Sequence, residues 1–142
     1  MKVVLDAYAV IAALVGERAR GEVEPLLRNG LVCAPHLAEV LDVCVRVHAN
    51  EERIVRERVG WLLSGGIEIA ALESTVALNA GALRAKHYRR RHCEISQGDC
   101  FALALAKHRG LALATADPDL AAVARAEGVD LIPLPDSHGR RP

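Results

Sequence analysis

The sequence predicts an α/β protein in which helices cover both faces of a parallel sheet. Five short apolar stretches, rich in Val, Ile, Leu or Ala, alternate along the chain with longer helical stretches. Strands buried on both faces have such continuous apolar sequences, and their alternation with helices is typical of parallel sheets. Right-handed crossovers then place the carboxyl ends of all strands at one edge, where ligands bind.

Length and composition predict one soluble globular domain. The chain has 142 residues, of which 51% are apolar and 25% charged. No apolar run approaches the ~20 residues that span a bilayer, and no signal segment opens the chain, so we expect a cytoplasmic protein without a membrane partner. The formal net charge is zero, which excludes binding of nucleic acid through a global basic field and leaves only local patches.

The four cysteines do not form a metal-binding pattern. They show no C-x-x-C pair and no spacing of a metal finger; they are Cys33, Cys44, Cys93 and Cys100. We therefore expect buried, reduced thiols.

The first half of the chain predicts three strands and four helices. The strands span residues 2–6, 31–34 and 67–72, and the helices span residues 7–15, 19–28, 35–49 and 52–64. Gly16 and Gly30 end two of these helices, and Gly65 and Gly66 end a third. Pro35 suits a first helical turn, where its missing N–H group is not needed.

The second half predicts three helices and two strands. The helices span residues 73–88, 96–110 and 117–127, and the strands span residues 111–114 and 130–134. Pro133 cannot donate to a central ladder and so predicts an edge strand. A basic, turn-like segment covers residues 89–94. We expect a single domain over residues 1–135 and a flexible tail over residues 136–142.

Three acids lie at the starts of helices. Asp6 ends the first strand and Asp117 follows the fourth, so strand order brings these two together at the ligand-binding edge. Asp99 begins the helix that leads into the fourth strand. Strand order alone would leave Asp99 at the opposite end of its βαβ unit, unless the start of that helix packs back toward the ligand-binding edge.

Each of these acids also has a purely structural explanation. Asp6 can cap the helix that follows it. Asp99 stands three residues after Ser96, the spacing of a capping box. Asp117 precedes Pro118, which makes it a good helix N-cap. Taken singly, the capping role is the favoured one.

Glu39 has a weaker signal than the other acids. It lies off the main apolar face of its helix, near Asp42 and Arg46. An exposed Asp42–Arg46 pair at i, i+4 spacing accounts for part of this surface. Asp42, one turn later, is an alternative to Glu39 as the acid of this helix that has a functional role, or a residue that supports Glu39.

Taken together, these residues resemble the PIN-domain nucleases, and in particular the VapC toxins of type II toxin–antitoxin modules. The resemblance rests on Asp6 after an apolar first strand, Glu39 in the helix after the second strand, Ser96-x-x-Asp99 opening an Ala/Leu helix, and Thr115-x-Asp117 after the fourth strand. It extends over residues 1 to about 134.

The resemblance implies a PIN-like three-layer α/β/α sandwich with a five-stranded, mainly parallel sheet, and a nuclease domain over residues 1–135. It implies that Asp6, Glu39, Asp99 and Asp117 converge as catalytic residues and metal ligands for Mg²⁺ or Mn²⁺, with Thr115 and Ser96 in support. It further implies an RNA substrate, a cognate VapB-like antitoxin and a homodimer. The antitoxin groove would lie over the helices of residues 7–28 and 35–64.

Physical chemistry explains why such a site needs a metal ion. Converging carboxylates repel one another and are partly desolvated, and a hard divalent cation with oxygen ligands relieves both penalties. A water of lowered pKa can then attack phosphorus in line. No His or Cys lies at ligand spacing, which argues against zinc. We expect Asp6 and Asp99 to be direct ligands.

A basic run leads directly to Ser96 and is the best candidate for phosphate binding. The candidates are Arg84, Lys86, Arg89, Arg90 and Arg91. The alternative is a solvated helix end whose cations complement the helix dipole.

Two other functions remain open on sequence grounds. A catalytically silent PIN-like interaction module would keep the fold without cleaving RNA, although all four acids are present. A receiver domain or nucleotide binder would share the doubly wound architecture. The chain lacks an acidic pair after its first strand and contains neither G-x-x-x-x-G-K-[ST] nor G-x-G-x-x-G, which counts against this class.

Overall fold

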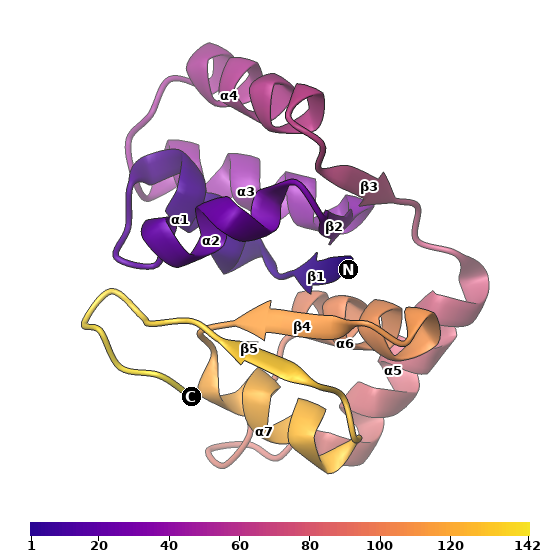
Figure 1. Ribbon diagram of the computed structural model, residues 1–142. Helices are drawn as coiled ribbons and strands as arrows, with labels where there is room; N and C mark the ends of the chain where they lie inside the picture. Colours follow the sequence, from indigo (N-terminus) through magenta and orange to yellow (C-terminus); the bar gives the residue numbers. More distant parts are fainter.

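The computed structural model describes residues 1–142 as a three-layer α/β/α sandwich (Figure 1). Its single sheet has five parallel strands in the order β3-β2-β1-β4-β5. The strands are β1 (Val3–Leu5), β2 (Gly30–Cys33), β3 (Glu68–Ala70), β4 (Ala112–Thr115) and β5 (Leu131–Pro133). The predicted fold class is confirmed, and the Pro133 strand lies at an edge as expected.

Seven helices cover the two faces of the sheet. They are α1 (Ala7–Val15), α2 (Arg20–Leu27), α3 (Ala34–Arg46), α4 (Glu52–Ser64), α5 (Ser74–His87), α6 (Gln97–Arg109) and α7 (Pro118–Ala126). Helices α1 to α4 lie on one face and α5 to α7 on the other (Figure 1). No helix is both long enough and apolar enough to cross a membrane.

Two hydrophobic clusters, one on each face of the sheet, form the core. Successive strand residues point to opposite faces, so Val4 packs with the α5–α7 cluster while Val3 and Leu5 pack with the α1–α4 cluster. Helix α6 is buried on nearly every side, from Cys100 through Ala102–Ala106. This burial explains why its sequence is almost entirely apolar.

The central pairing is between β1 and β4. Leu5 pairs with Ala114 in the parallel register, and β2 pairs with β1 on its other side. The order of strands therefore reverses next to β1, and the carboxyl ends of β1 and β4 meet at this switch point.

The predicted element boundaries differ from the observed ones by a few residues. The largest difference is at the end of α3, which stops at Arg46 rather than at residue 49, where Ala49 has a φ of 55°. All four cysteines are free; Cys33, Cys44 and Cys100 are buried, whereas Cys93 is only partly buried.

Candidate active site

Asp6 is a buried carboxylate at the carboxyl end of β1. It caps α1, with Oδ1 accepting a hydrogen bond from the Ala9 N–H at 2.8 Å, and its residue is only 3% exposed. The pKa of Asp6 is raised to about 7: burial is the largest cause, and the charges of Asp99 and Asp117 act in the same direction, whereas hydrogen bonds from Thr115 and Ala9 lower it. Because screening by water and salt weakens the effect of a charge with distance, these contributions indicate that the three acids lie near one another.

Asp117 follows β4 and caps α7. Its Oδ1 accepts a hydrogen bond from the Leu120 N–H at 2.7 Å, and Pro118 occupies the first turn as expected. The Asp117 N–H donates to Oγ1 of the fully buried Thr115 at 3.0 Å. Thr115 therefore contacts both acids, since its hydroxyl also hydrogen-bonds Asp6.

Asp99 lies in the first turn of α6, in the capping box that its spacing predicts. The Asp99 N–H donates to Ser96 Oγ at 3.1 Å, and the Ser96 N–H donates to Asp99 Oδ2 at 3.2 Å. Burial raises the pKa of Asp99, and Asp117 raises it further, while the Ser96 hydrogen bonds and His36 lower it.

The position of Asp99, left open by strand order, follows from the direction of α6. This helix runs back along the sheet before β4, so it starts at the carboxyl edge of the strands (Figure 1). His36 follows the carboxyl end of β2 and contacts Gly98 in the first turn of α6, which fixes that turn at the same edge. Asp99 is thus brought to Asp6 and Asp117.

Glu39 reaches the group from the second turn of α3. The residue is exposed, but its Oε2 lies 3.2 Å from the point where a Cβ on Gly98 would stand. Partial burial of the carboxylate raises its pKa, His36 lowers it, and Asp99 raises it. Asp42 instead forms the expected pair with Arg46, with Arg46 Nη2 donating to Asp42 Oδ2 at 2.7 Å.

His36 is a residue of this region that the sequence did not indicate. It is 1% exposed, and its Nε2 lies 2.9 Å from the Gly98 carbonyl oxygen. Because a carbonyl can only accept, Nε2 is the donor, and the buried Nδ1 has no hydrogen-bond partner. A lone His in a first helical turn carries no local signal of this contact.

The comparison with protein families decides the identity of the fold. The model of the PIN domain matches residues 3–126, most of the chain. The chain belongs to the PIN-domain family. No curated protein sequence matches it significantly.

Solved structures with the same fold include several toxin–antitoxin proteins. VapBC2 from Rickettsia felis, bound to a promoter DNA fragment, superposes with a TM-score of 0.70 at 17% identity, covering 93% of this chain and 98% of that chain. DNA-bound VapBC from Salmonella typhimurium superposes with a TM-score of 0.69 at 20% identity, covering 93% of this chain and 97% of that chain. VapC20 from Mycobacterium tuberculosis, a Sarcin-Ricin loop cleaving toxin, superposes with a TM-score of 0.69 at 16% identity, covering 85% of this chain and 94% of that chain.

The acids of this PIN domain suit a hard divalent cation by their chemistry. All four are oxygen donors, and their mutual repulsion favours a bound positive charge. No three His, Cys, Asp or Glu side chains are placed to hold one ion together. Asp6, Asp99 and Asp117 each retain a capping hydrogen bond. Mg²⁺ characteristically takes one or two carboxylates and keeps several waters, so this arrangement fits it.

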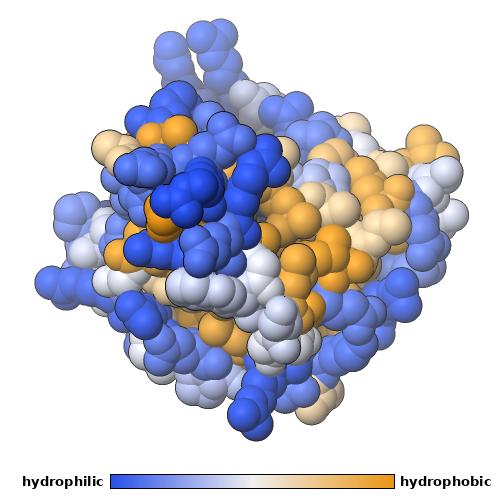
Figure 2. All heavy atoms as spheres, turned by 90° about the horizontal axis from the view of Figure 1, so that it is seen from above, coloured by the Kyte–Doolittle hydropathy of each residue, from blue (hydrophilic) through white to orange (hydrophobic).

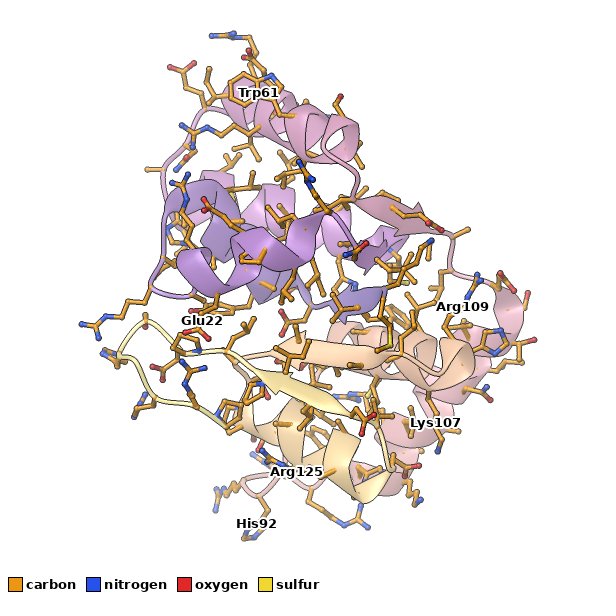
Figure 3. The ribbon with its side chains drawn as sticks, viewed as in Figure 1. Glu22, Trp61, His92, Lys107, Arg109 and Arg125 are labelled. Carbon is orange, nitrogen blue, oxygen red and sulfur yellow. The ribbon has the colours of Figure 1, made fainter.

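The basic residues before α6 contact different parts of the PIN domain. Arg84 Nε donates to the Ile95 carbonyl at 3.1 Å, next to Ser96. Lys86 instead donates to Glu127 Oε1 at 2.7 Å, and Lys107, near the far end of α6, donates to the same carboxylate at 2.5 Å. Figure 3 shows Lys107 and Arg109 at the side of the molecule opposite Glu22.

The loop of residues 89–94 borders the carboxyl edge. The Glu94 N–H donates to Asp119 Oδ2 at 2.9 Å, which ties this loop to the first turn of α7 (Figure 1). Arg89 pairs with Cys93 in an isolated bridge, and Arg91 has a φ of 67°. The loop that carries Arg89, Arg90 and Arg91 therefore lies near the start of α7, which Asp117 caps.

Residues 134–142 fold back over the same edge as a C-terminal hook. Tyr8 Oη donates to the Pro135 carbonyl at 3.0 Å, and Arg141 donates to both carboxylate oxygens of Glu22 at 2.9 and 2.6 Å. A pocket of about 500 Å³ lies between Tyr8, Asp117 and the hook. The flexibility expected of residues 136–142 stays a prediction about their motion.

Proposed function

We propose that the protein is a metal-dependent endoribonuclease of the VapC type, a toxin that hydrolyses RNA phosphodiester bonds. The observation that carries the proposal is the grouping of Asp6, Asp99 and Asp117, whose charges raise the pKa of Asp6. Membership of the PIN-domain family and the shared fold with VapC structures support it.

Mg²⁺ or Mn²⁺ is the cofactor that these acids fit. Asp6 and Asp99 would bind the ion directly, and Glu39 and Asp117 would complete the site directly or through water. When bound, such an ion supplies a water of lowered pKa and positive charge against the developing phosphorane.

The chain itself keeps the acids in position before RNA binds. Thr115 Oγ1 accepts a hydrogen bond from the Asp117 backbone N–H at 3.0 Å, and the Thr115 hydroxyl also hydrogen-bonds the Asp6 carboxylate. The Ser96 hydroxyl accepts a hydrogen bond from the Asp99 N–H, and the Ser96 N–H donates one to the Asp99 carboxylate. These contacts fix the carboxylates on rigid strand ends and helix starts, which limits the reorganisation that the reaction requires.

RNA binding requires positive charge beside these acids. We assign this role to Arg84, Lys86, Arg89, Arg90 and Arg91 as a group. Arg84 and the loop of residues 89–94 support the assignment because they adjoin the starts of α6 and α7. Electrostatic contacts of this kind position the backbone of the RNA and read no sequence.

A VapB-like antitoxin is the proposed protein partner. A groove of about 490 Å³ lies between α1, α2 and α4, lined by Leu14, Val15, Leu27, Trp61 and Leu62 among others. Trp61 is 65% exposed and projects from α4 (Figure 3). Viewed from the α4 side, an apolar patch lies among hydrophilic residues (Figure 2). Exposed apolar surface of this kind marks interaction sites, and the similar VapBC structures are toxin–antitoxin complexes.

Two further features complete the proposal. The protein acts in the cytoplasm, which its four free thiols fit because reducing compartments keep cysteines unpaired. It works as a homodimer, as the resemblance to VapC toxins implies.

The alternative is a catalytically silent PIN-like interaction module. Two observations favour it: no three His, Cys, Asp or Glu side chains are placed to hold an ion, and Asp6, Asp99 and Asp117 all take part in helix capping. Both proposals accept the same fold, so only an activity measurement separates them.

The test is RNA cleavage by purified protein with Mn²⁺ or Mg²⁺. Wild type should cleave, and Asp6→Asn and Asp99→Asn should abolish cleavage while keeping the folded circular dichroism spectrum. Asp130→Asn is the matched control, since Asp130 is an exposed acid just before β5, at the opposite edge of the sheet. Equal residual cleavage by wild type and both site variants would leave the silent module as the better account.

A further inference from the structure

A small pocket lies beside the first turn of α6, outside the group of acids. Its volume is about 290 Å³, and it is lined by Gly81, Arg84, Ala85, Tyr88 and Gln97. A Cβ added to Gly81 would meet no atom within 4 Å, so there is free space in the pocket next to α5.

Arg84 is held rigidly in this pocket. Its Nε donates to the Ile95 carbonyl at 3.1 Å, and its guanidinium lies over the Tyr88 ring, 4.5 Å from the centroid. The hydrogen bond at Nε and the stacking on Tyr88 fix the plane of the guanidinium. Little conformational entropy is therefore lost when its two terminal nitrogens bind a ligand.

The terminal nitrogens of Arg84 are free to bind. Neither has a hydrogen-bond partner, and neither is a buried unsatisfied atom, since only His36 Nδ1 is of that kind. No acid forms an ion pair with Arg84. In contrast, Lys86 is occupied by Glu127, and Arg109 lies 3.6 Å from Glu73. Arg84 therefore presents an uncompensated positive charge in a prepared orientation.

One peptide unit joins Arg84 to Asp99. The carbonyl of the Ile95–Ser96 peptide accepts from Arg84 Nε, and the N–H of the same peptide donates to Asp99 Oδ2 at 3.2 Å. The guanidinium and the carboxylate therefore lie on the order of 8 Å apart, given ordinary peptide dimensions.

We propose that Arg84 binds the phosphate group of the RNA nucleotide next to the bond that is cleaved, with its two terminal nitrogens forming a fork on the phosphate oxygens. This inference rests on the proposed nuclease function, and it assigns to one residue the phosphate contact nearest the acids. The shared peptide sets the distance between that phosphate and Asp99, so binding here places the neighbouring phosphate at the acids. A planar fork suits a phosphate better than the point charge of Lys.

The experiment measures binding without cleavage. The full chain carrying Asp6→Asn is titrated with a short oligouridylate at several salt concentrations, with and without Arg84→Gln. Losing one phosphate contact should weaken binding about tenfold at low salt and reduce the slope of log affinity against log salt by about 0.7. Arg109→Gln is the matched control and should leave both quantities unchanged.

A purely structural role for Arg84 predicts a different outcome. If Arg84 only pins the Ile95 carbonyl, Arg84→Gln lowers stability and leaves the salt slope at its original value, which overturns the proposal. An equal loss of affinity in Arg109→Gln also overturns it. Arg84→Lys keeps the charge and serves if Arg84→Gln does not fold: the salt slope should persist while affinity falls about threefold, and full wild-type affinity would contradict the fork.

Binding and cleavage separate the two proposals. If wild type never cleaves RNA but Arg84→Gln weakens binding as expected, the nuclease function fails and the phosphate contact stands. If wild type cleaves RNA and Arg84→Gln binds as tightly as its parent, the nuclease function stands and the phosphate contact fails.

Discussion

His36 donates a hydrogen bond from Nε2 to the Gly98 carbonyl oxygen, at 2.9 Å, and so ties the first turn of α3 to the first turn of α6. Glu39 stands one turn after His36, and Asp99 follows Gly98 directly. The spacing between the candidate acids Glu39 and Asp99 therefore depends on the buried imidazole of His36, which is not one of the acids.

Replacing His36 should reduce activity more than stability. His36→Phe removes the bond to Gly98, at a cost of about 1 kcal/mol in the free energy of unfolding, and lets the two turns separate. RNA cleavage should fall about tenfold or more, because small displacements of catalytic groups are costly. Urea unfolding and initial cleavage rates measure the two effects. His36→Gln, whose amide can still donate, should recover part of the cleavage; no recovery would contradict a role for this hydrogen bond.

Gly98→Ala should lower activity without lowering stability. The new Cβ would stand 3.2 Å from Glu39 Oε2, so the flexible Glu39 carboxylate must shift by a few tenths of an ångström. Alanine favours a helix over glycine by up to about 1 kcal/mol, so the melting temperature should hold or rise. Cleavage should nevertheless fall about threefold to tenfold.

The control for this change is Gly60→Ala in α4. A Cβ there meets nothing within 4 Å, and the residue is exposed. This variant should gain a similar helix-propensity term and cleave RNA at the wild-type rate. If Gly98→Ala also cleaves at the wild-type rate, Glu39 does not need its present position.

Divalent metal should stabilise the protein through the grouped acids. At a free Mn²⁺ concentration of 100 times the dissociation constant, the gain is about 2.7 kcal/mol, which raises the melting temperature by several degrees. The shift should be small in Asp6→Asn and Asp99→Asn and unchanged in Asp130→Asn. Thermal melts with Mn²⁺ and with a chelator provide the measurement, and an equal shift in all four proteins would place the ion elsewhere.

Glu127 should give the protein acid-sensitive stability away from the site. Hydrogen bonds from His87, Lys107 and Lys86 lower the pKa of Glu127 to about 2. A lowered carboxyl pKa contributes stability above the unfolded value near 4.5, and that stability is lost as the pH falls from there through about 2. Glu127→Gln should cost about 1 kcal/mol at pH 7, since water and salt screen these cations, and nothing near pH 2.

Urea unfolding at pH 7 and at decreasing pH measures this difference. Glu57→Gln is the control, because Glu57 lies 3.8 Å from Arg53 in an exposed pair and should contribute little at any pH. A Glu127→Gln deficit that persists unchanged at the lowest pH at which the protein folds would show that lost packing, and not lost charge, is its cause.

Local sequence signals were enough to predict the elements and their caps. The Ser96–Asp99 capping box and the Asp117–Pro118 helix start have the predicted form. These features depend on residues one to three apart, where spacing fixes which groups can meet. The capping and site roles of these acids do not compete, because a carboxylate has more than one lone pair to offer.

The contacts between distant segments could not be predicted in this way. The partner of His36 is a backbone carbonyl 62 residues away, and a glycine carbonyl has no signature in sequence. Arg84 and Lys86 look equivalent in the basic run, yet they stand on different sides of α5 and meet Ile95 and Glu127 respectively. Residues two apart on a helix do not share a face.

The sequence by itself determined the α/β class, the positions of the strands and helices, and the four acids that mark the PIN-domain pattern, because apolar periodicity and cap spacing are local properties. Strand order also predicted that Asp6 and Asp117 share one edge of the sheet, whereas only the tertiary structure decided which other segments meet there. The parallel pairing of β1 with β4 and the return direction of α6 bring Asp6, Asp117 and Asp99 to one edge. It also singled out Arg84 among the cations, because burial and hydrogen bonding depend on neighbours in space and not on neighbours in the chain.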